Sequence, residues 1–115
     1  MGRVAVVGLA LTGVTALLAS PALAAGNSAV CHSASICKVS ASGFPGGTIS
    51  VDADASARGT GRWILTGPIG YRCSKDFPQH GPVRSWSCAN APAGRYTAQV
   101  TPDQGLHTLK IGIRW

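Results

Sequence analysis

Residues 91–100, APAGRYTAQV, carry the strongest fold signal in the chain. A Pro-x-Gly turn is followed by an alternation of polar and apolar residues, a pattern typical of a half-buried antiparallel strand. Tyr96, Ala98 and Val100 share one side of that strand. Because Tyr96 is in phase with the apolar residues, we expect it to be buried and to hold the fold together rather than to contact a ligand.

The chain beyond residue 37 contains several other short strand-like segments. The alternation is clear over residues 48–54, 62–66 and 108–115 and weaker over residues 38–42, 70–73 and 83–88. Clusters of Gly and Pro separate these segments and interrupt every window long enough for an amphipathic helix. The sequence therefore predicts an all-β domain over residues 38–115, a sandwich or small barrel of six to seven antiparallel strands.

The stretch PAGRYT at residues 92–97, together with Trp63 in phase with Leu65, resembles a bacterial immunoglobulin-like β-sandwich. The resemblance implies that Trp63 packs in strand C, that residues 95–100 form strand F, and that strands C, F and G share one sheet. It also implies a tyrosine corner, in which the Tyr96 hydroxyl bonds to backbone a few residues upstream. Neither strand B nor strand F holds the cysteine found in antibody domains. The composition is similar to that of small secreted proteins of high-GC Gram-positive bacteria.

Residues 1–24 have the order of a secretory signal peptide. Arg3 precedes an apolar run over residues 4–18, and Ser20-Pro21 leads to a small-residue cleavage site at residues 22–24. The run is shorter than the ~20 apolar residues of a membrane span. We therefore expect residues 1–24 to be removed, leaving a secreted, extracellular protein whose mature form has no membrane span.

Four cysteines follow the expected cleavage site. In an exported chain an even number of cysteines indicates disulfides, and four cysteines allow three pairings. We favour the pairs nearest in sequence, Cys31–Cys37 and Cys73–Cys88. The first bridge would tether residues 25–37, which we expect to be a loop-rich lead-in to the sandwich. The C-x5-C and C-x14-C spacings differ from zinc motifs, so we expect no metal and no cofactor.

The titratable residues do not form a recognised catalytic motif. The chain has four aspartates, no glutamate and three scattered histidines. Asp52 and Asp54 alternate with apolar neighbours, which is typical of solvent-facing strand positions. With all thiols in disulfides, no cysteine nucleophile remains. We expect a protein that is not an enzyme, with a small secreted hydrolase as the last alternative.

The charge of the chain predicts a binding function. Ten Lys and Arg against four Asp give a formal net charge of +6. If strands C, F and G share a sheet, one face carries Arg62, Arg95, Lys110 and Arg114. Such a face attracts polyanions, and we expect an anionic cell-envelope polymer, or a secreted protein, as the partner of a monomeric domain. No recognition motif accompanies the charge, so specific nucleic acid recognition is not expected.

The segment between Cys73 and Cys88 supports an alternative function. If these cysteines pair, residues 74–87 form a constrained loop containing Pro78 and Pro82, and a preorganised loop loses little entropy on binding. The protein would then be a loop-type inhibitor of an extracellular protease, acting through Lys75, Asp76, Phe77, Pro78, Gln79 and His80. The sequence alone leaves open whether this loop is functional or only stabilises the domain.

Overall fold

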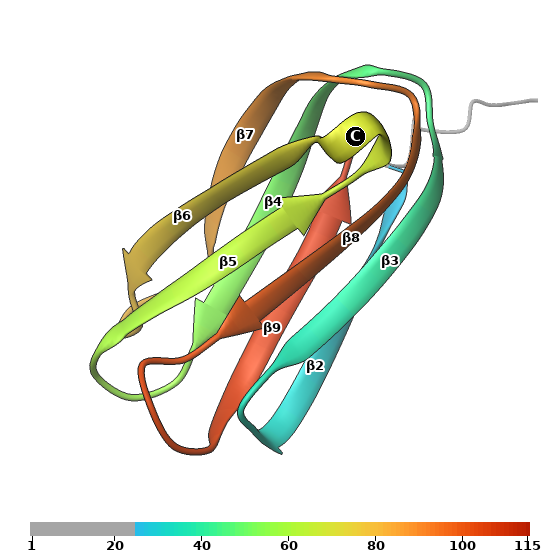
Figure 1. The fold of residues 1–115 in the computed structure, drawn as a ribbon. Coiled ribbons are helices and arrows are strands. Elements are labelled where there is room, and N and C mark those ends of the chain that lie inside the picture. Colours follow the sequence, from blue (N-terminus) through green and yellow to red (C-terminus); the bar gives the residue numbers. More distant parts are fainter. Residues whose placement is uncertain (1–24) are drawn as a thin grey trace, which may run out of the picture.

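The computed structural model describes residues 25–115, which form two four-stranded antiparallel sheets packed face to face (Figure 1). The predicted signal peptide, residues 1–24, lies outside the described residues. The described part contains two sheets, two disulfides and one hydrophobic core between the sheets. Its elements are β2 (Gly26–Ala34), β3 (Cys37–Phe44), β4 (Gly47–Ala55), β5 (Thr60–Thr66), the 3-10 turn η1 (Pro68–Gly70), β6 (Arg72–Pro78), β7 (Arg84–Ala91), β8 (Gly94–Thr101) and β9 (His107–Arg114).

The strands pair as if one long hairpin had been rolled up. One sheet has the order β2-β9-β4-β7 and the other the order β3-β8-β5-β6. The pairs β2–β9, β3–β8, β4–β7 and β5–β6 are nested within one another, which is the connectivity of an eight-stranded jelly roll. The predicted all-β sandwich is confirmed. In the immunoglobulin arrangement the last strand lies beside strand F, whereas here β9 lies between β2 and β4 in the opposite sheet from β8.

The expectation that residues 25–37 are a loop-rich lead-in is wrong for most of that segment. Residues 26–34 form β2, whose pairing with β9 runs from Gly26 opposite Arg114 to Cys31 opposite Leu109. β2 is an edge strand, so it buries little apolar surface, and its sequence, GNSAVCHSA, lacks the alternation that marks the inner strands. This strand raises the total to eight instead of six to seven.

Tyr96 and Trp63 lie in the core, as predicted. Their exposed fractions are 0% and 1%. The Tyr96 hydroxyl donates a hydrogen bond of 2.5 Å to the carbonyl of Pro92, four residues upstream, which is the tyrosine-corner contact. Phe44 and Tyr71 pack edge-on against the Tyr96 ring, with centroids 5.5 and 5.8 Å away. Gly67 is needed for this packing, because a Cβ at position 67 would lie only 2.1 Å from the Tyr96 ring.

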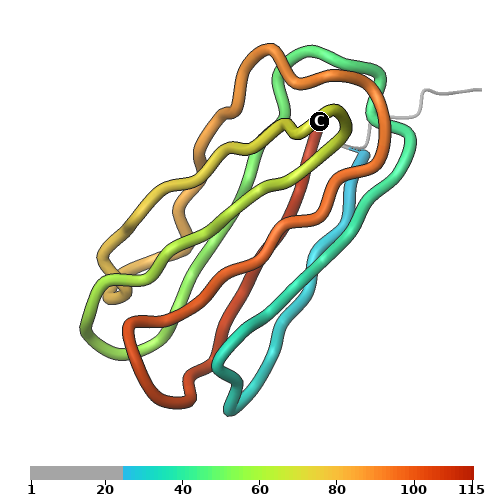
Figure 2. Tube along the Cα trace, viewed as in Figure 1, coloured from blue at the N-terminus to red at the C-terminus, as the bar shows by residue number. Residues whose placement is uncertain are grey.

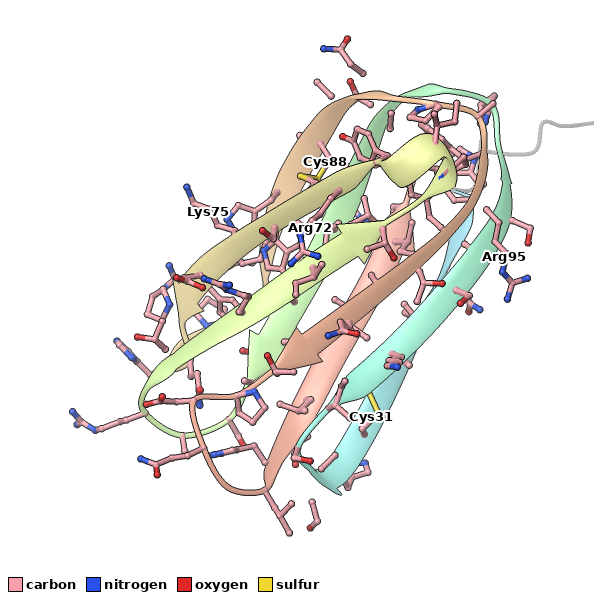
Figure 3. The ribbon with its side chains drawn as sticks, viewed as in Figure 1. Cys31, Arg72, Lys75, Cys88 and Arg95 are labelled. Carbon is pink, nitrogen blue, oxygen red and sulfur yellow. A yellow bond between two sulfur atoms is a disulfide. The ribbon has the colours of Figure 1, made fainter. Side chains whose placement is uncertain are left out.

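Both predicted disulfides are present, and each joins one sheet to the other. Cys31–Cys37 connects β2 to the start of β3, and Cys73–Cys88 connects β6 to β7. β2 and β7 are the two edges of the first sheet, and β3 and β6 are the two edges of the second. The bridges therefore staple the sandwich along both of its open sides (Figure 3). A bridge closing a loop of the Cys73–Cys88 size stabilises a small domain by about 3 kcal/mol.

Candidate functional site

The structure does not bring the four predicted basic residues together. Arg62 lies on β5 and Arg95 on β8, and both point outward from the β3-β8-β5-β6 sheet. Lys110 and Arg114 lie on β9 and point outward from the other sheet. The predicted common face is therefore wrong, because β9 joins the sheet of β4 instead of that of β8. The two outer faces must be considered separately.

The outer face of the β2-β9-β4-β7 sheet has equal numbers of positive and negative side chains, and we call it the balanced face. Its charged residues are Lys110 and Arg114 of β9 and Asp52 and Asp54 of β4, which are neighbouring strands in register. Arg114 donates two hydrogen bonds to Asp52, from Nε at 2.6 Å and from Nη2 at 2.8 Å. These bonds lower the pKa of the Asp52 carboxyl below its usual value. The cation of Arg114 is thus neutralised within the molecule.

A shallow hollow of about 350 Å³ opens on the balanced face. It forms because Gly112 has no side chain between the outward positions of Lys110 and Arg114. Two charged groups of its wall already bond to each other, since Asp52 accepts hydrogen bonds from Arg114, and Asp52 accepts a further one from Ser85 nearby. An adjoining hollow of about 190 Å³ shares Ser28, Asp52 and Gly112 with it. The hollow therefore offers a ligand few unused polar groups.

The outer face of the β3-β8-β5-β6 sheet is strongly cationic, and we call it the basic face. It carries Lys38 of β3, Arg62 of β5, Arg72 of β6 and Arg95 of β8 against one carboxylate, Asp76 of β6. The strand register places these residues outward. For example, Arg72 is opposite the exposed Thr66, and Lys38 lies between the buried Cys37 and Val39.

Only one cation of the basic face is paired. Arg62 Nε lies 2.6 Å from Asp76 Oδ1, and this contact lowers the pKa of the Asp76 carboxyl. Both side chains are 54% exposed, so water screens the pair. Within residues 25–115, Lys38, Arg72 and Arg95 form no ion pair. Arg95 makes one marginal contact of 3.5 Å with the Ser42 hydroxyl, and Figure 3 shows its side chain pointing away from the sheet.

Short polar side chains fill the basic face between the cations. Ser40, Thr97 and Thr66 are neighbours across β3, β8 and β5, and Gln99 lies beside them on β8. The Ser40 and Thr97 hydroxyl oxygens are 2.9 Å apart. The two hollows described above both open on the other face of the molecule. The basic face therefore presents cations and hydroxyls side by side.

The predicted inhibitory loop is not a projecting loop. Residues 72–78 form β6 and residues 84–91 form β7, so only a short turn joins them. Phe77 is 3% exposed and packs against Trp86, with ring centroids 5.4 Å apart. It fills the space above Gly61, where a Cβ would lie 3.0 Å from the ring. Phe77 therefore belongs to the core and is not presented to a protease.

Gln79 is also unavailable for contact, because it ties three loops together. Its side chain is 1% exposed, and its Nε2 donates to the carbonyls of Ser56 and Arg58 at 3.0 and 3.3 Å. Its Oε1 accepts a hydrogen bond from the backbone N–H of Asp103. The three loops lie at the same end of the sandwich (Figure 2). Of the predicted inhibitory residues, Lys75, Asp76, Pro78 and His80 remain exposed.

Other chemistry is limited within residues 25–115. Four cysteines are in disulfides, and no cluster of three or more His, Cys, Asp or Glu side chains could hold a metal ion. The His107 ring contacts the carbonyl of Gln104. None of the helical structure in residues 25–115 has the length and hydrophobicity of a membrane span.

Two members of the basic face, Lys38 and Arg72, were not among the residues singled out from the sequence. Both lie in segments that alternate weakly, over residues 38–42 and 70–73. The signal that could have found them is their position beside inward-facing cysteines, since Lys38 follows Cys37 and Arg72 precedes Cys73. Searches for similar proteins add no further candidates, because no protein-family model matches the chain and no similar curated protein is found.

Proposed function

We propose that this protein is a secreted, non-enzymatic binding module that holds an extended anionic polymer of the cell envelope against its basic face. The observation that carries the proposal is the unequal charge of the two outer faces. The basic face has four cations and one carboxylate, whereas the balanced face has two of each. A surface with an excess of positive charge attracts polyanions and raises their local concentration.

The residue types of the basic face favour phosphate or carboxylate groups. Three of its four cations are arginines, whose planar guanidinium donates paired hydrogen bonds to both groups. The hydroxyls between the cations can bond to sugar hydroxyls or to ester oxygens. A location outside the cytoplasm is supported by the two disulfides and by the leader-like order of residues 1–24.

Binding to a defined polyanion tests this proposal. Linear polyphosphate and polygalacturonate are suitable probes, because they supply phosphate and carboxylate without other chemistry. We expect residues 25–115 to bind at least one of them at low salt and to lose affinity as salt rises, since Debye screening shortens to about 10 Å near 0.1 M. The absence of binding to both probes at low salt would contradict the proposal.

Matched variants separate the face from the total charge. The variant Lys38→Gln/Arg72→Gln/Arg95→Gln removes three cations from the basic face. The control Arg58→Gln/Arg84→Gln/Lys110→Gln removes three exposed cations that lie elsewhere. We expect the first variant to lose affinity about a hundredfold, at roughly 1 kcal/mol for each charge-assisted contact. The control should lose only a few-fold, and equal losses would show that net charge alone drives binding.

A further inference from the structure

The turn between β5 and β6 presents one apolar side chain to solvent. Ile69 is 95% exposed, the highest value among the large hydrophobic residues of the described chain. Its φ is 58° and its ψ 32°, in the left-handed region. A β-branched residue is rarely found there, because its Cβ crowds the backbone. An exposed apolar residue in a strained conformation has no evident structural purpose, and such outliers often lie at binding sites.

The turn around Ile69 is held rigidly. The Gly67 N–H donates to the Tyr71 carbonyl and the Tyr71 N–H donates to the Pro68 carbonyl, both at 3.0 Å. The Tyr71 hydroxyl donates to the carbonyl of Ala89 on β7 at 2.8 Å. Pro68 packs on Gly94, where a Cβ would lie 2.6 Å from the proline ring. The turn is therefore fixed on two sides, and the Ile69 side chain stays at its apex.

The end of the sandwich that bears Ile69 combines small residues with cations. Its three connections, residues 45–46, 67–71 and 92–93, contain Gly, Pro and Ala, with Ile69 and Tyr71, and no charged residue. None of the four aspartates lies there. Arg72 begins β6 directly after the turn, and Arg95 follows the glycine on which Pro68 packs. The exposed Ile69 thus lies shortly before Arg72 in the chain, and neither Arg72 nor Arg95 forms an ion pair within residues 25–115.

We propose that the Ile69 tip docks the domain onto an anionic lipid surface. Ile69 would enter the boundary between headgroups and acyl chains, while Arg72 and Arg95 contact lipid phosphates. Reversible membrane binding commonly combines one apolar insertion with basic residues.

A lipid surface fits this tip better than a protein pocket does. A stable protein interface buries about 800 Å² on each partner, usually around aromatic or Arg anchors. In the three connections at this end, the exposed residues besides Ile69 are Pro45, Gly70 and Ala93, which offer little side-chain surface. A membrane needs no complementary shape and responds to the apolar side chain and the positive charge alone.

Vesicle flotation with residues 25–115 tests the proposal. The probes are vesicles of phosphatidylcholine mixed with phosphatidylglycerol, and vesicles of phosphatidylcholine alone. We expect the protein to float with the anionic vesicles and not with the neutral ones. Failure to float with anionic vesicles at low salt, or equal flotation with both kinds, would overturn the proposal.

The variant Ile69→Asn separates the tip from the fold. Asn adopts the left-handed region more readily than Ile, so this variant should unfold at the same or a higher temperature than the original protein. Its partition into anionic vesicles should fall about tenfold or more, because the apolar contact is lost. Ile69→Leu should keep most of the binding. Leu106→Ser is the matched control, since Leu106 is 67% exposed at the opposite end of the sandwich.

Two variants distinguish a failure of the lipid proposal from a failure of the polymer proposal. Ile69→Asn should leave polyphosphate or polygalacturonate binding unchanged, whereas Lys38→Gln should weaken polymer binding more than vesicle binding. Vesicle binding by Ile69→Asn equal to that of the original protein would contradict the lipid proposal, whatever the polymer result.

Discussion

The two outer faces of this sandwich are built on the same alternation but differ in what they leave available to a partner. On the balanced face, β4 and β9 lie side by side and place Asp52 against Arg114, so the charges bond to one another. On the basic face, the only acidic residue within residues 25–115 is on the edge strand β6, and it pairs with one arginine of β5. Strand order therefore decides which cations are neutralised internally and which are free to bind a ligand.

The largest expected effect comes from reversing the charge of the basic face. We expect Lys38→Glu/Arg72→Glu/Arg95→Glu to abolish polyanion binding, because attraction is replaced by repulsion. Unfolding temperature, measured on the same samples, should change little, since all three side chains are exposed. Retained binding by a folded triple variant would remove the distinction between the two faces.

A smaller effect is expected when the balanced face is given a positive charge. Asp52→Asn/Asp54→Asn leaves Lys110 and Arg114 without carboxylate neighbours on that face. We expect polyanion affinity to rise by only a few-fold, because the balanced face would then offer two cations, fewer than the basic face offers. Titration calorimetry gives both the affinity and the number of sites. A gain as large as the loss from the basic-face variants would show that any exposed cation pair suffices.

The smallest expected effects are on stability, and they come from removing the acidic partner of each ion pair, one on each face. The Asp52 side chain is 23% exposed, whereas that of Asp76 is 54% exposed. We expect Asp52→Asn to lower the free energy of unfolding by about 1 kcal/mol and Asp76→Asn to lower it less. Urea unfolding at neutral pH measures both changes.

The pH dependence of the Asp52 effect has a definite sign. Arg114 lowers the pKa of Asp52 in the folded protein, so the unfolded chain binds a proton at higher pH than the folded one. The stabilisation is therefore complete above the ordinary Asp value of about 3.9 and disappears as pH falls through the lower folded pKa. An Asp52→Asn difference that grew on acidification would contradict the Asp52–Arg114 pairing.

The sequence predicted what depends on local pattern and missed what depends on strand order. The turn before Tyr96 and the phase of Trp63 indicated their burial, and the nearest-neighbour cysteine pairs were found as expected. β9 lies between β2 and β4. The alternation of a strand indicates which of its side chains are buried but not which strands it pairs with, and β2, as an edge strand, has little hydrophobic pattern to detect.

The prediction of the candidate site was partly wrong because it depended on strand order. Lys110 and Arg114 point outward as the alternation indicated, but from the opposite sheet, and Arg114 is paired with Asp52. Lys38 and Arg72 lie in weakly patterned strands, so their side of the sheet became clear only from the register with β8 and β5. Phe77 and Gln79 lie between half-cystines, where a constrained loop was a reasonable but wrong expectation.

The central claim is that a polyanion lies on the basic face, and an NMR titration of isotope-labelled residues 25–115 with polyphosphate tests it most directly. We expect the amide signals of Lys38, Thr97 and Arg72 to shift progressively with added polyphosphate and to return when salt is raised. The signals of Asp52 and Gly112 on the balanced face should stay in place. Shifts centred on Asp52 and Gly112, or no shifts at low salt, would contradict the account.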